Sequence, residues 1–300
     1  MTDTLFTRET PPVSAATPRL VPLSGLLDEW DAEALAAHDA YTKGLARGPI
    51  TGLPKLDEDL GGFLATGVNV LHASPGIGKT ALALQIGATC GCPALYLSAE
   101  MSALELLRRL TARVTGTFLG KFRTGEIAPD ESRKLGRRAA ASAPLLTIAD
   151  ASRGAFAGAE WLQQAGEIVR GDAPHLLLVI DSVHSWAEGA PGATVEYDRL
   201  GAAIQALRQL GQNLNCSILA IAERNRMSMK TGGMSASAGH RGFEYGAESV
   251  IELNRDEDAT QDARGEFAVT LKITKNRHGS PSKTIKLSFH GALQRFRETD

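Results

Sequence analysis

The run Ala73-Ser74-Pro75-Gly76-Ile77-Gly78-Lys79-Thr80 constrains the fold of this chain more than any other segment. An apolar segment typical of a β-strand, Val68–Leu71, precedes it, and a segment typical of a helix, Ala81–Ile86, follows it. Between a strand and a helix, such a run forms a tight turn whose backbone N–H groups point at phosphate oxygens. It matches the pattern G-x-x-x-x-G-K-[ST] with alanine at the first position. We therefore predict that the chain binds a nucleoside triphosphate through this phosphate-binding loop.

The side chains of this loop have expected roles. Lys79 would reach the β- and γ-phosphates, and the Thr80 hydroxyl would bind Mg²⁺. The expected substrate and cofactor are thus ATP and Mg²⁺. The alternative is a chance glycine-rich turn, and the strand–loop–helix context argues against it. The residues expected to surround the nucleotide are Ser74, Pro75, Gly76, Ile77, Gly78, Lys79, Thr80 and Ala81.

Composition limits the classes of partner. The chain has 300 residues, 43% of them hydrophobic, which is enough for a substantial core. Its net charge of −2 excludes a generally basic surface, so any nucleic acid would have to be held by locally concentrated charge. No apolar run approaches the roughly 18 residues of a membrane span, and the N-terminus lacks a basic-then-apolar signal. We expect a cytoplasmic protein with no membrane partner.

The cysteines offer two interpretations. Cys90 and Cys92 could form a metal or redox pair, but the sequence has no second cysteine pair and no nearby histidine cluster to complete a site. We therefore expect structural thiols in a reducing compartment.

Three regions follow one another along the chain. Residues 1–23 are polar and proline-rich, which predicts a disordered tail. Residues 24–47 contain a helical stretch, Ser24–Leu45, that could fold back on its own domain or dock on a neighbouring subunit. Residues 48–300 form the predicted ATPase domain. The apolar stripe expected on the helix consists of Leu27, Trp30, Ala34, Ala37, Tyr41 and Leu45.

The ATPase domain alternates short aliphatic runs with helical ones. This alternation favours an α/β fold with a mostly parallel central sheet and helices on both faces, and the closely spaced strands at the end favour an antiparallel extension. The predicted strands are Val68–Leu71, Ala94–Ser98, Leu145–Ile148, Leu176–Ile180, Ser217–Ala222, Ser249–Leu253, Phe267–Thr274 and Lys283–Phe289. The predicted long helices are Thr80–Thr89, Ala103–Thr115, Asp130–Ala141, Ala157–Arg170 and Val195–Leu214.

Two carboxylates follow predicted strands. Asp181 ends the apolar run Leu176–Ile180, where it could hold Mg²⁺ at the edge at which open α/β sheets bind ligands. Glu100 lies just past Ala94–Ser98, where it could orient water toward the γ-phosphate. The alternative for both is an acid that merely ends a strand. The residues Ser102 and Glu105 supply a capping box for the next helix, which leaves Glu100 available.

Two cations near the C-terminus could act in catalysis. Lys275 and Arg277 follow the strand Phe267–Thr274, and two residues apart on extended backbone they would point the same way. An inserted arginine can stabilise charge on the transferring phosphoryl group, often from another subunit. A solvated basic hairpin turn is the alternative.

The chain from about residue 45 to residue 296 resembles the motor domain of DnaB-type replicative helicases, which has a RecA-like P-loop NTPase fold. The resemblance rests on several motifs in order rather than on the phosphate-binding loop alone. These are Ile50-Thr-Gly-Leu-Pro-Lys-Leu-Asp57, Lys79-Thr-Ala-Leu-Ala-Leu84, Glu100-Met101, Arg123-Thr-Gly125, Ala220-Ile-Ala-Glu-Arg-Asn-Arg226, Phe243-Glu244 with Ala247-Glu248, and Arg255-Asp-Glu257. The segment Lys275-Asn-Arg277-His-Gly279 is also similar to a signature of the RadA/Sms recombination ATPases.

The resemblance implies a role for each matching residue. Glu100 matches the catalytic glutamate, Asp181 the acid of the Mg²⁺ site, and Lys275 with Arg277 the basic pair that reaches the neighbouring subunit's nucleotide. It also implies a ring, usually a hexamer, with ATP between subunits and single-stranded DNA through the centre. The helix Leu27–Leu45 resembles the linker helix that docks on the adjacent motor domain. One departure is Glu223, which stands where the family usually has glutamine.

A basic segment is the predicted DNA contact. No acid lies between Glu223 and Glu244, and in a RecA-like ring this segment would project into the channel and track phosphates without reading bases. A disordered surface loop is the alternative. Ser185–Thr194 is a second candidate loop, in which Trp186 could stack on a base but is expected to be a core or interface residue. The predicted DNA-binding residues are Arg224, Arg226, Lys230 and Arg241.

Three hypotheses for function follow. The first is an ATP-dependent helicase or translocase that acts in DNA replication as a ring on single-stranded DNA. The second is a RadA-like recombination ATPase. The third is an ATP-switched protein that regulates or loads another helicase and meets other replication or recombination proteins.

Overall fold

The computed structural model describes residues 20–189, 196–223, 246–255, 260–280 and 284–299. The chain divides into two compact units, one ending at Leu45 and the other beginning at Ala46. We describe each unit separately.

The described part of the first unit is a single helical segment. A 3₁₀ helix, η1 (Leu23–Leu26), leads into α1 (Leu27–Thr42), and no residue of α1 is buried. The helix ends earlier than the predicted limit of Leu45, because Gly44 adopts a left-handed conformation with φ of 63°. Leu45, which was assigned to the apolar stripe, therefore lies beyond the helix. Most of the predicted tail, residues 1–19, is outside the described chain.

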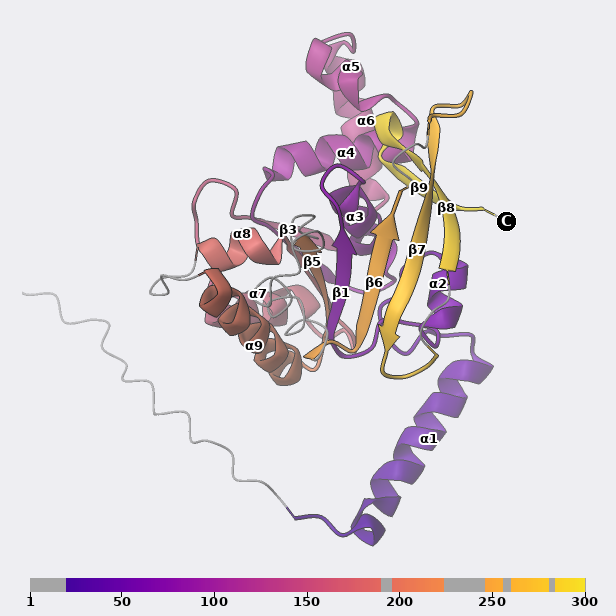
Figure 1. Cartoon of the computed structure of the whole chain (residues 1–300), viewed down its shortest axis with the longest axis vertical. Helices are drawn as coiled ribbons and strands as arrows, with labels where there is room; N and C mark the ends of the chain where they lie inside the picture. Colours follow the sequence, from indigo (N-terminus) through magenta and orange to yellow (C-terminus); the bar gives the residue numbers. More distant parts are fainter. Residues whose placement is uncertain (1–19, 190–195, 224–245, 256–259, 281–283, 300) are drawn as a thin grey trace, which may run out of the picture. The chain divides into compact units, whose positions relative to one another are not determined.

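The second unit is built on one mixed sheet, visible in Figure 1. Its described strands have the order β3-β2-β4-β5-β1-β6-β7-β8-β9. Neighbours from β3 to β6 are parallel, and β6 to β9 pair in antiparallel fashion, which confirms the predicted mixed architecture. The strands are β1 (Gly67–Ala73), β2 (Ala94–Ser98), β3 (Leu146–Asp150), β4 (Leu177–Asp181), β5 (Ser217–Glu223), β6 (Ser249–Asn254), β7 (Glu266–Asn276), β8 (Thr284–His290) and β9 (Arg295–Glu298).

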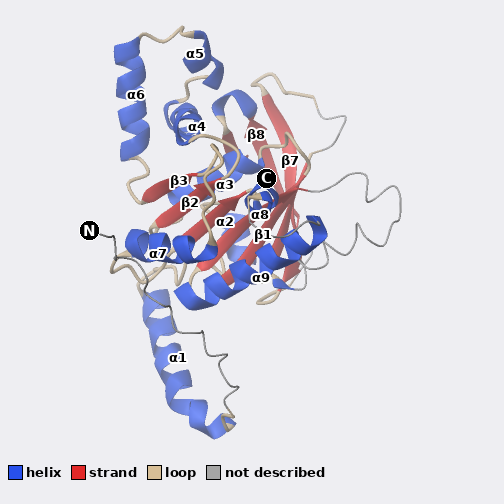
Figure 2. Cartoon of the chain, turned by 90° about the vertical axis from the view of Figure 1, so that its left-hand side faces the viewer, coloured by secondary structure: helices blue, strands red, loops and turns tan. Residues whose placement is uncertain are grey.

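Helices cover both faces of this sheet (Figure 2). Alternate residues of the central strands enter opposite cores: Val179 of β4 packs in the core under α3 and α4, and Leu178 packs in the core under α7 and α9. The helices are α2 (Pro54–Asp59), α3 (Lys79–Thr89), α4 (Ala103–Thr115), α5 (Leu119–Thr124), α6 (Pro129–Ala141), α7 (Ala159–Arg170), α8 (Val183–Glu188) and α9 (Glu196–Leu214), with a 3₁₀ turn η2 (Gly291–Leu293).

The structure adds elements that the sequence patterns did not predict. The short helices α2, α5 and α8 and the strand β9 are new, and β7 extends two residues beyond the predicted end at Thr274. The prediction of a loop over Ser185–Thr194 is wrong in its first part, because Ser185 and Trp186 lie in α8. Trp186 is buried and its indole donates to the carbonyl of Ala157 at 2.7 Å, as expected of a core residue. Residues 190–194 lie outside the described chain.

Two absences hold for the described residues. No described helix combines the length and apolar character that crossing a membrane requires. Cys90 and Cys92 are buried thiols whose sulfurs lie 3.9 Å apart, and no group of three potential metal-ligating side chains occurs among the described residues. The hydrogen bond with Cys90, together with burial, raises the pKa of the Cys92 thiol, which agrees with a structural role.

Candidate ATPase site

The phosphate-binding loop connects the end of β1 to the start of α3. Gly76 and Gly78 adopt φ values of 78° and 106°, which L side chains rarely adopt. A Cβ on Gly78 would also lie 2.9 Å from the ring of Phe289 and 3.0 Å from that of Phe296. These two rings stack with centroids 4.2 Å apart. The antiparallel extension thus packs against the loop and requires glycine at position 78.

Helix α3 is tied to the same extension through Gln85. Its buried side-chain amide donates to the carbonyl of Phe296 at 3.1 Å and accepts from the Phe296 backbone N–H at 3.0 Å. Strand β9 therefore fixes the helix whose first turn carries Lys79 and Thr80. Sequence reasoning missed this bond.

Lys79 points back over the phosphate-binding loop. Its ammonium donates to the carbonyl of Ala73 at 3.1 Å and to that of Ser74 at 3.4 Å. It also lies 3.6 Å from Oε1 of Glu223, at the end of β5. The Lys79 side chain is 10% exposed and that of Glu223 is 48% exposed. A phosphate group would therefore compete with Glu223 for the ammonium.

Asp181 and Thr80 form the expected metal-binding pair. The Thr80 hydroxyl hydrogen-bonds to Asp181, and the Tyr96 hydroxyl donates to Oδ2 of Asp181 at 2.6 Å. Burial raises the pKa of Asp181, although the hydrogen bonds from Tyr96 and Thr80 oppose the shift. Mg²⁺ is commonly held by one or two protein oxygens together with substrate phosphates, and this carboxylate–hydroxyl pair beside Lys79 fits such a site.

Glu100 is held beside Asp181. The hydroxyls of Ser182 and Ser185 donate to its Oε1 at 2.5 Å and 2.8 Å, and the N–H of Ala99 donates to the carbonyl of Asp181 at 2.8 Å. Glu100 itself is exposed, so a water molecule can reach the carboxylate. The structure thus brings Lys79, Thr80, Asp181 and Glu100 to one edge of the sheet.

The predicted capping box is only half formed. Ser102 caps α4 by accepting from the N–H of Glu105 at 3.3 Å. The Glu105 carboxylate instead lies 3.4 Å from Arg108 and 3.5 Å from Arg109. Glu100 takes no part in this cap, as expected.

Sequence reasoning missed the hydroxyls that hold the two acids. Ser182 directly follows Asp181 and caps α8, so its spacing from Ser185 could have indicated a helix start. Tyr96 lies inside a buried strand, and its neighbours in the sequence carry no signal for a hydrogen bond to Asp181.

Arg277 lies at the opposite edge of the sheet. Its backbone N–H donates to the carbonyl of Glu248 at 2.9 Å, and the N–H of Glu248 donates to the carbonyl of Val68, at the start of β1, at 2.7 Å. The phosphate-binding loop begins after Ala73, at the other end of that strand. Five steps of about 3.3 Å separate Val68 from Ala73, about 16 Å. The structure therefore does not bring Arg277 to the phosphate-binding loop of its own chain.

The other predicted residues divide into two groups. Lys275 lies in β7, paired with Val250, but the strand ends at Asn276. The alternation that should have aligned Lys275 with Arg277 therefore stops one residue too early. The predicted DNA-binding residues all lie outside the described chain; they are Arg224, Arg226, Lys230 and Arg241.

Comparison with known proteins places the chain in a family. Residues 48–298 match the family model of the DnaB-like helicase C terminal domain. The replicative DNA helicase DnaB of Treponema pallidum (strain Nichols) is 27% identical over 83% of this chain and 56% of its own length. The corresponding helicase of Pasteurella multocida (strain Pm70) is 24% identical over 83% of this chain and 55% of its own length. The chain thus spans little more than half the length of these curated relatives.

Solved structures agree on the fold. A structure of an isolated ATPase domain superposes with a TM-score of 0.76 at 18% identity, covering 91% of this chain and 99% of that one. A DnaB-like replicative helicase, solved in a study of its interactions with primase, gives a TM-score of 0.71 at 18% identity, covering 93% and 73%. The sheet order and the phosphate-binding loop are those of a RecA-like ATPase. The chain belongs to the DnaB-like helicase C-terminal domain family.

Proposed function

We propose that this protein is an ATP-driven helicase or translocase that acts in DNA replication as a homo-oligomeric ring, a hexamer, on single-stranded DNA in the cytoplasm. The observation that carries the proposal is the separation of Arg277 from the phosphate-binding loop of its own chain. A complete site for phosphoryl transfer then requires the loop edge of one subunit and the Arg277 edge of another. Membership in the DnaB-like family supports the same assembly.

Each residue at the loop edge has a chemical task. Lys79 binds the β- and γ-phosphates once they displace Glu223, and Thr80 with Asp181 holds Mg²⁺. The metal neutralises charge on the β- and γ-phosphate oxygens. Glu100, fixed by Ser182 and Ser185, orients water in line with the γ-phosphate. The groups that would surround the phosphates are the backbone of residues Ser74 to Ala81.

The partner subunit would supply the remaining positive charge. Arg277 of one subunit stabilises the charge that develops on the phosphoryl group bound by the next, and Lys275 assists from β7. The exposed side chains of α1, including Trp30 and Leu35, suit docking on a neighbouring copy.

DNA contact is assigned to the segment that follows β5. Arg224, Arg226, Lys230 and Arg241 would contact the phosphates of a single strand, and six copies would concentrate enough charge despite the net charge of −2. Since Glu223 immediately precedes this segment and contacts Lys79, the nucleotide and the DNA would meet at opposite ends of one short connection.

Steady-state ATP hydrolysis with and without single-stranded DNA tests the proposal. We expect strong stimulation by DNA, complete loss of turnover in Lys79→Ala, and unchanged turnover in the control Lys134→Ala, whose side chain is 77% exposed. Turnover indifferent to DNA, with no DNA binding at low salt, would contradict the motor assignment and favour an ATP-switched interaction protein. A preference for branched over forked substrates would favour the RadA-like role.

A further inference from the structure

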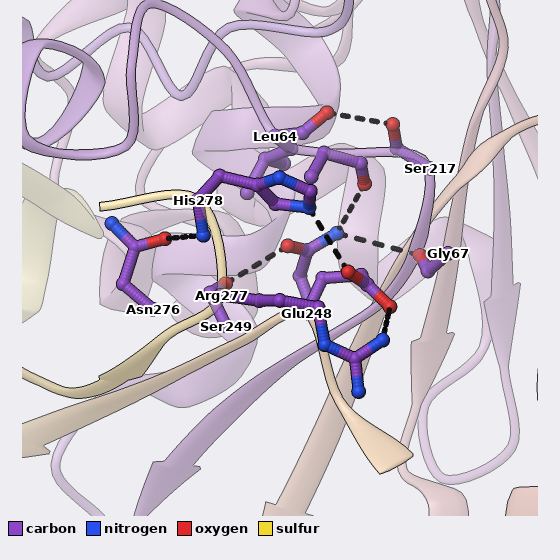
Figure 3. Close-up of polar contacts among 10 residues, drawn as sticks. Leu64, Gly67, Ser217, Glu248, Ser249, Asn276, Arg277 and His278 are labelled. Atoms are coloured by element: carbon purple, nitrogen blue, oxygen red, sulfur yellow. Dashed lines mark hydrogen bonds and ion pairs between the residues drawn. The ribbon is translucent and has the colours of Figure 1, made fainter. Parts of the chain in front are cut away.

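One carboxylate organises the edge of the sheet that carries Arg277. Glu248 lies just before β6, and its Oε1 accepts from Nη1 of Arg277 at 2.9 Å. Its Oε2 lies 3.0 Å from Nε2 of His278. Figure 3 shows Arg277 and His278, from the turn after β7, converging on this single side chain.

Glu248 is itself firmly held. Its backbone N–H bonds to Val68 and its carbonyl accepts from Arg277, so it is part of the sheet's hydrogen-bond network. Its side chain is 15% exposed, and its Cγ would lie 3.0 Å from a Cβ added at Gly67. This packing leaves the carboxylate little freedom to move.

The turn that carries Arg277 is also braced from the other side. The Asn276 side chain donates to the carbonyl of Asp59, at the end of α2, at 3.0 Å. Its Oδ1 accepts from the N–H of His278 at 3.1 Å. Residues on both sides of Arg277 are therefore fixed, and the direction of its own side chain depends on Glu248.

The contact with Glu248 leaves part of the guanidinium available. Arginine has five N–H donors in a planar fork, and Glu248 bonds to Nη1. The Arg277 side chain is 49% exposed. One edge of the fork is therefore anchored, while the opposite edge can meet an anion on another molecule.

We propose that Glu248 is a positioning residue that aims Arg277 at the nucleotide of the neighbouring subunit. The inference rests on the proposed function, in which Arg277 acts across the subunit interface. Glu248 contacts neither nucleotide nor water; it acts through the guanidinium. His278 closes the arrangement by occupying the second carboxylate oxygen, which keeps the first oxygen directed at Arg277.

Mixed assemblies separate this role from a general structural one. Two chains are co-expressed with different affinity tags and purified through both tags: a donor chain with Lys79→Ala and intact Arg277, and an acceptor chain with Arg277→Ala and intact Lys79. Each chain alone is inactive, and a mixed interface contains one complete site. Glu248→Ala is then placed either in the donor or in the acceptor.

We expect the donor placement to lower the recovered kcat about tenfold, with KM for ATP unchanged, which corresponds to the loss of one charge-assisted hydrogen bond. The acceptor placement should cost nothing further, because that chain has no Arg277 to aim. Glu248→Gln in the donor should recover part of the rate, since its amide oxygen still accepts from Nη1.

The outcomes are distinct. Equal loss from both placements, or no loss from the donor placement, would overturn the positioning role while leaving the action of Arg277 across the interface intact. No recovery in the original mixture would instead overturn the proposed action of Arg277 between subunits, and the inference with it.

Discussion

The two edges of the central sheet are built differently and carry complementary chemistry. At the carboxyl edge of the parallel strands, the loops after β1, β2 and β4 bring Lys79, Glu100 and Asp181 together. At the opposite edge, the antiparallel strand β7 delivers Arg277 beside Glu248. Parallel strands place successive loops at a common edge, whereas one antiparallel strand reverses the chain and sends its end to the other. The difference indicates a site divided between two copies of the chain.

The electrostatic balance of the edges differs as well. Three acids, Asp181, Glu100 and Glu223, accompany the phosphate-binding Lys79 at one edge. At the other, a single carboxylate faces both Arg277 and His278. A bound triphosphate would therefore lack positive charge on one subunit alone, and the Arg277 edge of another copy would supply it.

Loss of Arg277 should have the largest effect among substitutions that spare binding. We expect Arg277→Ala to lower kcat about 10³-fold, because transition-state charge is left uncompensated, with ATP affinity unchanged. Steady-state kinetics and fluorescent-nucleotide titration measure the two quantities. The matched control is Arg133→Ala, at a side chain that is 65% exposed. Unchanged turnover would remove the interface role of Arg277.

Loss of the catalytic carboxylate should come next. We expect Glu100→Gln to reduce kcat about 10²-fold, since an amide cannot take a proton from water. ATP affinity should stay within about twofold, because Glu100 contacts water rather than the nucleotide. Equal losses in binding and turnover would instead place Glu100 in the phosphate or metal site.

A smaller effect should follow from loosening Glu100. Ser185→Ala removes one hydroxyl that donates to this carboxylate but leaves the Ser182 cap of α8 in place. We expect a decrease in kcat of about tenfold, the value of one charge-assisted hydrogen bond, without a change in melting temperature. A drop in melting temperature equal to that of a capping mutant would show that Ser185 is structural.

The smallest predicted effect concerns the acid that competes for Lys79. Glu223→Gln removes a half-exposed ion pair, and such pairs contribute about 0.2–1 kcal/mol, so ATP should bind about two- to fivefold more tightly. Nucleotide titration measures this effect, with the exposed Glu188→Gln as the control. Weaker binding of ATP would contradict the competition between Glu223 and phosphate.

The sequence predicts the parts of this molecule that depend on local order. The phosphate-binding loop, Asp181 and Glu100 each follow an apolar strand, so their place at the carboxyl edge can be inferred from the pattern of strands and helices alone. Parallel pairing of neighbouring strands then brings them together without further information.

The residues that support this site could not be predicted, because their contacts span large sequence separations. Tyr96 and Asp181 are 85 residues apart, and Gln85 and Phe296 are 211 apart. Strand β9 contains one buried hydrophobic residue, Phe296, and its pairing with β8 decides its conformation. The position of Arg277 at the far edge depends on the direction of β7, which no local pattern reveals.

The central claim is that the two edges complete one active site between copies. The most direct test mixes the two inactive chains Lys79→Ala and Arg277→Ala in varying ratios and measures ATP hydrolysis. The account predicts that activity reappears and is greatest at an intermediate ratio, where interfaces between unlike subunits are most frequent. No activity at any ratio, although both tags show that the two chains assemble together, would contradict it.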